Sequence, residues 1–570
     1  MCSICGGEYG LEVVRRASKK MRHRGPDFSG EFSKGGIALA HNRLSIIDLD
    51  LHANQPFTSP LCPHLVLVFN GEIYNYLEIK SDLEKCGIPF FTKSDTEVLL
   101  HAFFHYGAES LKKFNGDFAF CILDVRDNSL FLARDRLGNK PLFYTLHNNK
   151  LFFASEIKAF FALGKFPFDY DEVSKWILFG CGDEVKTIYS GILNFPKAHF
   201  ATYKGGILKF SKYWDFSPEF EALKKPFNKA RLDSSLCELE SLLQDSLKIR
   251  LRSDVPVALS VSGGVDSSIL AHLAIRLNAN CELFGINFKE NKSGDESKHL
   301  AQLQEDLGVK INFLTPSLNS IKSDFKKLVS TQDEITHSLS QYAQFLLFCE
   351  IAKTHKVALG GQGADELFGG YYHHVGRFIY ENFSEFENRA FIYGQEAFRE
   401  YNFGLKCALK KELKLKLFEN DNKKGLACLE SLGLPLPSLE PLLERFHPSF
   451  SCGLWLDLIK FNLPHLLRYE DRNSMNFGLE NRTPFTDFRL VEFAFKINEN
   501  FKFQKGFSKY ILRLLLEKLG SFKLAWRTDK IGFCVPEFEL LKTLGIKAES
   551  LFEVRLEIFR ELKRVRNDMD

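Results

Sequence analysis

The chain has 570 residues, of which 45% are hydrophobic and 26% are charged, and its formal net charge is +3. This length predicts roughly two to four domains. The nearly balanced charge gives no net field that would favour binding to nucleic acid or to an anionic membrane. The 13 cysteines are not expected to form a disulfide scaffold in so long a chain. The sequence shows neither an apolar signal segment nor a run of about 18 apolar residues. We therefore expect a cytoplasmic protein without a membrane span.

The N-terminal part of the chain has the pattern of a β-rich domain. Short apolar runs separated by polar turns predict strands at 36–39, 65–69, 118–123 and 130–133, and helical patterns occupy 76–84 and 96–106. We expect residues 1–200 to form stacked sheets covered by helices. Residues 201–232 are expected to be a connector.

Strands and helices alternate from residue 233 onward. The predicted order is a helix at 234–250, a strand at 255–261, a glycine-rich turn, a helix at 267–277, a strand at 283–288 and a strand at 356–359. This alternation is typical of a parallel α/β sheet. We expect a second domain at 233–540 that is mostly helical beyond residue 372, followed by a charged amphipathic helix at 541–570.

Cys2 follows only the initiator methionine. Removal of Met1 would leave a thiol beside a free α-amine, which can accept the thiol proton because it titrates near about pH 8. By itself this signal is weak, because a cysteine at position 2 is usually accidental. The residues that follow give it more weight.

Six polar strings follow Cys2 in the first domain. They are RHRGPD at 22–27, HNRLSIID at 41–48, NGEIYN at 70–75, SDTE at 94–97, NGD at 115–117 and ARDRLG at 133–138. Each string alone could be an ordinary turn. Together and in this order, they resemble the glutaminase domain of class II amidotransferases, whose fold is the αββα sandwich of N-terminal-nucleophile enzymes.

The resemblance implies a glutaminase site. Cys2 would attack the side-chain amide of glutamine, and Asn70 and the backbone of Gly71 would stabilise the oxyanion. An amino acid substrate needs one cation for its carboxylate and anions for its ammonium group. The residues that would bind glutamine are Arg43, Asn70, Glu72 and Asp95.

A turn rich in serine and glycine occupies residues 260–268, with the sequence SVSGGVDSS. It lies between a predicted strand and a predicted helix, where backbone N–H groups bind phosphate. Its spacing differs from the GxxxxGK[ST] loop, so transfer of a γ-phosphate is not implied. It resembles the pyrophosphate loop of ATP pyrophosphatases, which form acyl-adenylates. The predicted ATP-binding residues are Ser260, Ser262, Gly263, Gly264, Asp266, Ser267 and Ser268, and Asp266 is also predicted to bind Mg²⁺.

Four further strings complete the second domain. They are LGGQGADELFGGY at 359–371, LRYEDRNSM at 467–475, ENRTPFTD at 480–487 and WRTDKIGF at 526–533. In this order they resemble the synthetase domain of glutamine-dependent asparagine synthetases, with an adenine-nucleotide-hydrolase-like fold. The whole resemblance runs from Cys2 to about Pro536.

This second resemblance implies roles for further residues. Lys530 would neutralise charge on the departing phosphates, and Asp365 would be a second ligand of Mg²⁺. The adenine and ribose pocket would be lined by Ile286, Gly360 and Gly361. The activated acceptor would lie near Asp333, Glu334 and Gln362.

Three departures distinguish the chain from the family pattern. Asparagine synthetases carry Gly-Glu-Gly where this chain has Gln362 between two glycines, and a glutamine side chain cannot act as a general base. Ile335 follows the Asp-Glu pair where proline is usual, and Ser3 follows Cys2 where glycine is typical. Gln362 leaves the acceptor open between aspartate, the leading one, and another carboxylate such as a sugar acid of a surface polysaccharide.

The expected activity is therefore glutamine- and ATP-dependent amidation of a carboxylate through an acyl-adenylate, with Mg²⁺ as the metal and small molecules as the only ligands. A third interpretation is a glutamine-binding regulatory protein without catalysis. The intact Cys2, the 260–268 turn and Lys530 argue against it. The sequence leaves the oligomeric state open, with a homodimer among the alternatives.

Overall fold

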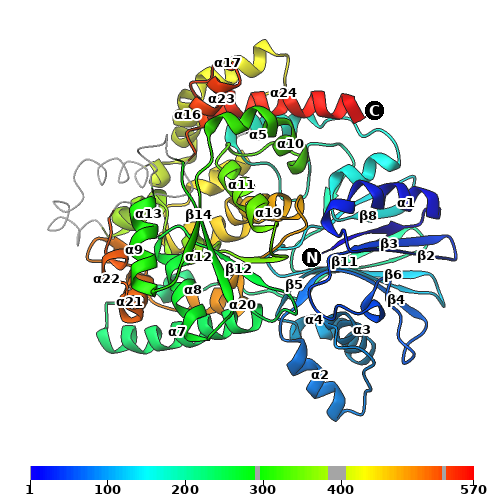
Figure 1. Cartoon of the computed structure of the whole chain (residues 1–570). Helices are drawn as coiled ribbons and strands as arrows, with labels where there is room; N and C mark the ends of the chain where they lie inside the picture. Colours follow the sequence, from blue (N-terminus) through cyan, green and yellow to red (C-terminus); the bar gives the residue numbers. More distant parts are fainter. Residues whose placement is uncertain (1, 289–295, 383–405, 439, 529–534, 570) are drawn as a thin grey trace.

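The computed structural model describes residues 2–288, 296–382, 406–438, 440–528 and 535–569. An N-terminal part built on two antiparallel sheets lies beside a C-terminal part built on one parallel sheet with helices, as expected (Figure 1). None of the helices described is long and apolar enough to cross a membrane.

The N-terminal part contains two stacked sheets. The first has the strand order β2 (Phe28–Lys34), β3 (Ile37–Arg43), β1 (Ser3–Gly7), β8 (Lys150–Ala154), β7 (Phe143–His147) and β9 (Leu193–Asn194). The second has the order β11 (Ile207–Lys212), β10 (His199–Lys204), β6 (Ser129–Arg134), β5 (Gly116–Asp124) and β4 (Leu65–Ile73). Alternate residues face the space between the sheets, where Leu39, Val68 and Phe153 pack in one core.

Helices cover the outer faces of both sheets (Figure 1). Val14 of α1 (Leu11–Lys20) packs in the same apolar cluster as Ala40 and Phe152 of the first sheet. Leu99 of α3 (Asp95–Tyr106) packs with Phe120 of the second sheet. Together with α2 (Tyr76–Lys85), these helices confirm the predicted αββα sandwich and both predicted helices.

The second sheet extends beyond the expected end of the first domain. Strand β11 ends at Lys212 and pairs with β10, so residues 201–212 belong to this sheet and not to a connector. Helix α7 (Lys229–Arg250) begins before residue 234 because Asn228 caps it, accepting a hydrogen bond from the Arg231 N–H at 3.0 Å. We propose a connector that runs from Tyr213 to Asn228.

The C-terminal sheet is parallel throughout, with the order β14 (Ile311–Leu314), β13 (Cys281–Ile286), β12 (Val257–Ser260), β15 (Val357–Leu359) and β16 (Glu480–Arg482). Helices on both faces bury its apolar strands. They include α8 (Val265–Arg276), α9 (Ser297–Leu307), α10 (Ile321–Gln332), α11 (Gln341–Ile351), α12 (Ala364–Phe368) and α13 (Tyr372–Glu381). Because the chain leaves β12 toward β13 and later returns on its other side as β15, a switch point lies between β12 and β15.

Beyond α13 the described chain is mostly helical. The main helices are α16 (Lys411–Asp421), α17 (Lys423–Ser431), α18 (Phe450–Leu456), α19 (Leu463–Met475), α20 (Phe488–Ala494), α21 (Tyr510–Leu519), α23 (Glu537–Thr543) and α24 (Leu551–Met569). The last helix is amphipathic, as predicted, and its apolar face is buried. It begins at Leu551 and not at residue 541, because α23 ends at Thr543 and Gly545 follows with a φ of +77°. Phe559 of α24 contacts Phe168 with ring centroids 5.4 Å apart, close to α5 (Tyr170–Phe179).

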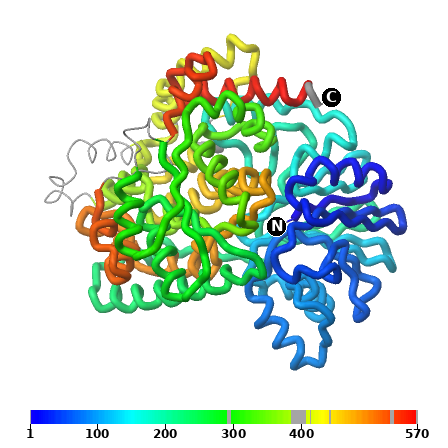
Figure 2. The backbone as a smooth tube through the Cα atoms, in the orientation of Figure 1, coloured from blue at the N-terminus to red at the C-terminus, as the bar shows by residue number. Residues whose placement is uncertain are grey.

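The N-terminus lies where the N-terminal part meets the C-terminal part (Figure 2). A buried ion-pair network joins the two parts near this end of the chain. The guanidinium of Arg24 donates to both carboxylate oxygens of Asp471 on α19, at 2.7 and 2.8 Å, and to Glu156 at 2.9 Å. Arg472 lies 3.0 Å from the same Glu156 carboxylate. The Arg24 side chain is fully buried, and a charge without access to water requires partners of this kind.

We expect Arg24→Met to destabilise the protein by about 3–5 kcal/mol, because the substitution leaves the buried Asp471 carboxylate without its bidentate partner. The free energy of unfolding, measured by urea denaturation, tests this expectation.

The matched control is Arg15→Met, since Arg15 pairs with Glu12 and Glu31 at the surface. Exposed pairs contribute little, so the control should unfold close to the parent. Equal midpoints for the two variants would contradict a structural role of the Arg24 network.

Candidate active sites

Cys2 lies at the entrance to β1 and is 7% exposed. Its backbone N–H donates to Oδ1 of Asn70 at 3.0 Å, and its carbonyl accepts from Nε of Arg24 at 3.0 Å. Burial raises the pKa of the Cys2 thiol, and the guanidinium of Arg43 opposes this shift. A thiol with a raised pKa needs a nearby base to become a nucleophile.

Asn70 and Gly71 lie together on β4, opposite β5. The Nδ2 of Asn70 is buried and has no hydrogen-bond partner among the described residues. Gly71 has a φ of +146°, and a Cβ at this position would lie 2.1 Å from the carbonyl oxygen of Asp117, so only glycine fits. An uncommitted amide donor next to the Cys2 backbone has the chemistry required for an oxyanion.

Arg43 ends β3 and projects into the loop that follows. Its guanidinium donates to the carbonyl of Asp50 at 2.9 Å and to Oδ1 of Asn54 at 2.7 Å. These neutral acceptors fix the guanidinium in place without neutralising its charge. Arg43 can therefore still attract an anion, and its charge acts on the Cys2 thiol.

Glu72 and Asp95 are two buried carboxylates beside this site, each 4% exposed. Burial and the neighbouring Asp95 raise the pKa of Glu72 well above its usual range, and burial raises the pKa of Asp95 to about 6. The backbone N–H of Ile73 donates to Asp95 at 2.9 Å. The structure thus brings all six predicted glutaminase residues together, and the pair of carboxylates suits a cation.

The 260–268 turn connects β12 to α8 at the carboxyl end of the sheet. The first turn of α8 has no side-chain cap, so its N–H groups can bind an anion. The hydroxyl of Ser267 accepts from the Ser262 N–H at 3.2 Å, which folds the turn back on itself. Gly263 has a φ of +69°, and a Cβ there would lie 2.7 Å from Cβ of His299.

The two predicted metal ligands converge on one point. Nζ of Lys509 lies 2.6 Å from Oδ2 of Asp266 and 2.6 Å from Oδ1 of Asp365. These carboxylates come from the turns after β12 and β15, at the switch point of the sheet. The ammonium group of Lys509 thus lies between two carboxylate oxygens. Because Mg²⁺ prefers oxygen ligands of this kind, Asp266 and Asp365 fit a magnesium site.

The other predicted nucleotide residues border the same crevice. A Cβ on Gly361 would lie 3.4 Å from Cβ of Asp266, so the two glycine-rich turns are in contact. Gly360 donates its N–H to the carbonyl of Arg482 at 2.9 Å, and Ile286 ends β13 and is 5% exposed. Lys530 lies outside the described residues.

The predicted acceptor residues are divided between two places. Asp333 accepts from the backbone N–H of Lys158 at 3.2 Å, and Glu334 accepts from the backbone N–H of Ile188 at 3.2 Å. Glu334 also forms an ion pair with Arg468 at 2.7 Å. Both carboxylates therefore lie at the contact between the two parts, whereas Gln362 lies in the turn after β15. The role of Asp333 and Glu334 at the acceptor stays a prediction.

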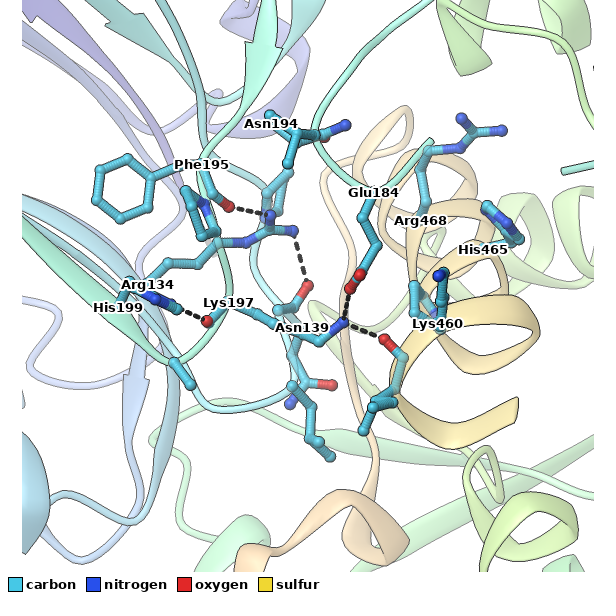
Figure 3. A pocket seen from close by; sticks show the side chains of 18 of the residues that line it. Arg134, Asn139, Glu184, Asn194, Phe195, Lys197, His199, Lys460, His465 and Arg468 are labelled. Carbon is cyan, nitrogen blue, oxygen red and sulfur yellow. Dashed lines mark hydrogen bonds and ion pairs between the residues drawn. The ribbon is translucent and has the colours of Figure 1, made fainter. Parts of the chain in front are cut away.

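A cavity of about 350 Å³ also lies between the two parts (Figure 3). Glu334 and Arg468 line it, together with Arg134 and Lys197, whose amine contacts Glu184 and the carbonyl of Ile459. Arg134 donates to the carbonyls of Phe195 and Gly138 at 2.8 and 3.0 Å. The polar groups that line this cavity are largely paired with other protein atoms. Neither Cys2 nor the 260–268 turn lines it.

Strand β16 connects the two candidate sites. Successive residues of a strand face opposite sides. Arg482 lies 3.6 Å from Glu72 and donates to Glu480 at 2.5 Å, on the glutaminase side. The amide of Asn481 lies 3.5 Å from the position of a Cβ on Gly360, on the side of the nucleotide crevice.

Three residues that border the candidate sites were not predicted from the sequence. Lys509 lies in no string that was singled out, and no spacing relates it to Asp266 or Asp365. Glu470 and Asp471 do lie in the 467–475 string. Their charges in that string were the available signal, but no local pattern shows that one faces the nucleotide crevice and the other faces Arg24.

Comparisons with known proteins agree with this two-site geometry. Residues 1–214 match the glutamine amidotransferase domain model, and residues 238–557 match the asparagine synthase model. Asparagine synthetase [glutamine-hydrolyzing] 1 of Bacillus subtilis is 29% identical to this chain, over 93% of this chain and 85% of its own length. A putative asparagine synthetase [glutamine-hydrolyzing] of Mycobacterium tuberculosis is 30% identical, over 93% and 85% respectively.

The relatives also include proteins with another name. Amidase chry2 of Gibberella zeae is 28% identical, over 88% of this chain and 82% of its own length. The asparagine synthase model alone covers more than half of the 570 residues. This chain therefore belongs to the asparagine synthase family and carries an N-terminal glutamine amidotransferase domain.

Proposed function

We propose that this protein transfers the amide nitrogen of glutamine to the side-chain carboxylate of aspartate, with ATP cleaved to AMP and pyrophosphate. Glutamine-dependent amidation of a carboxylate follows from the two family domains. The observation that carries the proposal is strand β16, whose opposite faces border the Cys2 site and the nucleotide crevice. Two chemically different sites on one strand suit two halves of one reaction.

The first half-reaction releases ammonia from glutamine. Sγ of Cys2 attacks the amide carbon, the C–N bond breaks, and a thioester forms that water then hydrolyses to glutamate. Nδ2 of Asn70 and the Gly71 N–H stabilise the oxyanion. Arg43 binds the substrate carboxylate and the pair of Glu72 and Asp95 binds its ammonium group. With Met1 removed, the α-amine of Cys2 accepts the thiol proton.

The second half-reaction activates the acceptor. Its carboxylate attacks the α-phosphorus of ATP and displaces pyrophosphate, which leaves an acyl-adenylate. The amides and hydroxyls of the 260–268 turn hold the phosphates. Asp266 and Asp365 would hold Mg²⁺, which neutralises phosphate charge, and Lys509 and Lys530 add positive charge.

Ammonia then passes between the sites inside the protein. Outside it, ammonia at neutral pH would be mostly ammonium, which has no lone pair for attack. The buried contact around β16 and α19 supports this route, because it joins the Cys2 site to the nucleotide crevice without crossing the surface.

Aspartate is the leading acceptor, because the relatives at 29–30% identity over 93% of this chain carry the name asparagine synthetase. The alternative is another carboxylate, such as a sugar acid of a surface polysaccharide. It keeps both sites and changes only the acceptor pocket. Two observations support this alternative acceptor. One relative is named as an amidase, and Gln362 stands where the family pattern has glutamate.

The acceptor is tested by pyrophosphate release with ATP, Mg²⁺ and glutamine, in the presence and absence of aspartate, with mass spectrometry of the product. We expect aspartate-dependent pyrophosphate and asparagine in equal amounts. Glutaminase activity without aspartate-dependent pyrophosphate would instead favour the other carboxylates.

The nucleophile is tested with Cys2→Ala, which should lose glutamine-dependent synthesis by at least about 100-fold and keep synthesis from added ammonium chloride. Cys5→Ala is the matched control, since Cys5 is buried on β1, close to Cys2 in the sequence, and its thiol donates to the carbonyl of Val14. Glutaminase activity in Cys2→Ala at the parent level would show that another group is the nucleophile.

The pH dependence of glutamine binding tests the carboxylate pair. Because the pKa of Asp95 is raised to about 6, the pair loses negative charge as the pH falls through this value, and KM for glutamine should rise. Asp95→Asn removes the group with this pKa, whereas burial still raises the pKa of Glu72, so KM in this variant should be higher and should lose the rise centred near pH 6. Ammonia-dependent synthesis is the control. A KM that stays constant between pH 5 and 7 would contradict the assignment.

A further inference from the structure

The amidation step needs a proton acceptor that the predicted site residues do not supply. When ammonia attacks an acyl-adenylate, the new nitrogen carries a positive charge and must lose a proton. Gln362 stands in the turn after β15, and its amide has no basic atom. Nearby, Asp266 and Asp365 contact Lys509, and Glu366 accepts a hydrogen bond from Tyr371 at 2.8 Å. These carboxylates already serve other contacts.

Glu470 is a further carboxylate at this turn. It lies on α19 and is 5% exposed. Its Oε1 lies 3.4 Å from the position of a Cβ on Gly360, so the carboxylate touches the backbone of the turn itself. The same oxygen accepts a hydrogen bond from Nε2 of Gln344 at 2.9 Å. That bond fixes the direction of the carboxylate.

The second oxygen of Glu470 is not committed. Its Oε2 is buried and accepts no well-aligned hydrogen bond from the described residues. Both polar atoms of the Asn481 side chain, close to the same glycine, are also buried and form no well-aligned hydrogen bond within the described part of the chain. Buried polar atoms without hydrogen-bond partners reduce the stability of a fold. Here such atoms lie together, between the glutaminase side of β16 and the nucleotide crevice.

We propose, on the basis of the proposed function, that Glu470 is the proton acceptor for ammonia in the amidation step, and that Gln362 and Asn481 orient the incoming nitrogen toward it. This arrangement moves the carboxylate from the turn to the adjacent helix. The family pattern has glutamate at the position of Gln362, and here the glutamate comes from α19.

The step balances without another reactant. The lone pair of ammonia forms the C–N bond to the acyl carbon, and one N–H proton moves to Oε2 of Glu470. The C–O bond to the phosphate then breaks, and AMP leaves with its electron pair. The proton on Glu470 passes to solvent after the products leave, which restores the carboxylate for the next cycle.

The electrostatic environment suits this role. Burial raises the pKa of Glu470 to about 8, and the neighbouring amides of Gln362, Asn481 and Gln344 together with the charge of Lys140 limit the rise. A carboxylate of ordinary pKa would be a weak base for an ammonium-like nitrogen. A base poised near neutral pH matches the proton transfer better.

The experiment compares Glu470→Gln with the exchanged double variant Gln362→Glu/Glu470→Gln, using the full chain with ATP, Mg²⁺ and the carboxylate that supports pyrophosphate release in the parent. Glutaminase activity, pyrophosphate release and amide product are measured separately. In Glu470→Gln, amide formation from ammonium chloride should fall by about 100-fold or more, with the fall in kcat and not in KM for the acceptor. Pyrophosphate release should exceed amide, because the adenylate is hydrolysed instead.

The exchanged variant should recover at least about 10-fold of this loss, since it returns one carboxylate to the turn. Glu350→Gln on α11, where Glu350 pairs with Lys353 at the surface, is the matched control and should behave like the parent. Thermal unfolding of each variant separates loss of folding from loss of chemistry.

Two outcomes would overturn the proposal. The first is amide formation in Glu470→Gln at the parent rate. The second is an equal fall in pyrophosphate release and amide formation that the exchanged variant does not recover, because this result indicates a structural role for Glu470. Absence of carboxylate-dependent pyrophosphate in the parent itself would refute the proposed function, so the two failures are distinguishable.

Discussion

The structure depends most on the bidentate contact between Arg24 and Asp471. Arg24 holds the carbonyl of Cys2 with its Nε and the carboxylate of Asp471 with its two terminal nitrogens. The nucleophile of one part is thereby tied to α19 of the other. Since the network is buried, any movement between the parts would expose unpaired charge to a region without water.

The contact between Arg24 and Asp471 positions the nucleotide crevice as well as the glutaminase site. Asp471 and Glu470 are neighbours on α19, so the helix that secures Cys2 also presents Glu470 to the turn after β15. Strand β16 adds a parallel connection, with Arg482 near Glu72 on one face and Asn481 near Gly360 on the other. Both sites therefore share one rigid support. Enzymes that transfer an unstable or volatile intermediate benefit from such fixed geometry.

Much of the molecule could be predicted from the sequence. The alternation of strands and helices after residue 233 gave the parallel sheet, and the string at 70–75 placed Asn70 and Gly71 beside Cys2. These predictions worked because each feature is local or belongs to a characteristic string. The end of the first domain was less clear, because β10 and the edge strand β11 are short and carry little apolar periodicity.

Other features had no local signal. Arg24 and Asp471 are 447 residues apart in the sequence, and no pattern of spacing pairs them. Lys509 meets Asp266 across 243 residues. Such contacts arise from the packing of whole elements. The role of Glu470 depends on the same packing, because its charge alone does not distinguish it from its neighbour Asp471.

The central claim is that the two sites act as one, with ammonia passing inside the protein. The most direct measurement supplies glutamine labelled with ¹⁵N in its side-chain amide, together with an excess of unlabelled ammonium chloride, and determines the isotope in the amide product by mass spectrometry. Internal passage predicts a product that retains the ¹⁵N label despite the excess. A product whose label is diluted to the composition of the solution would contradict the account.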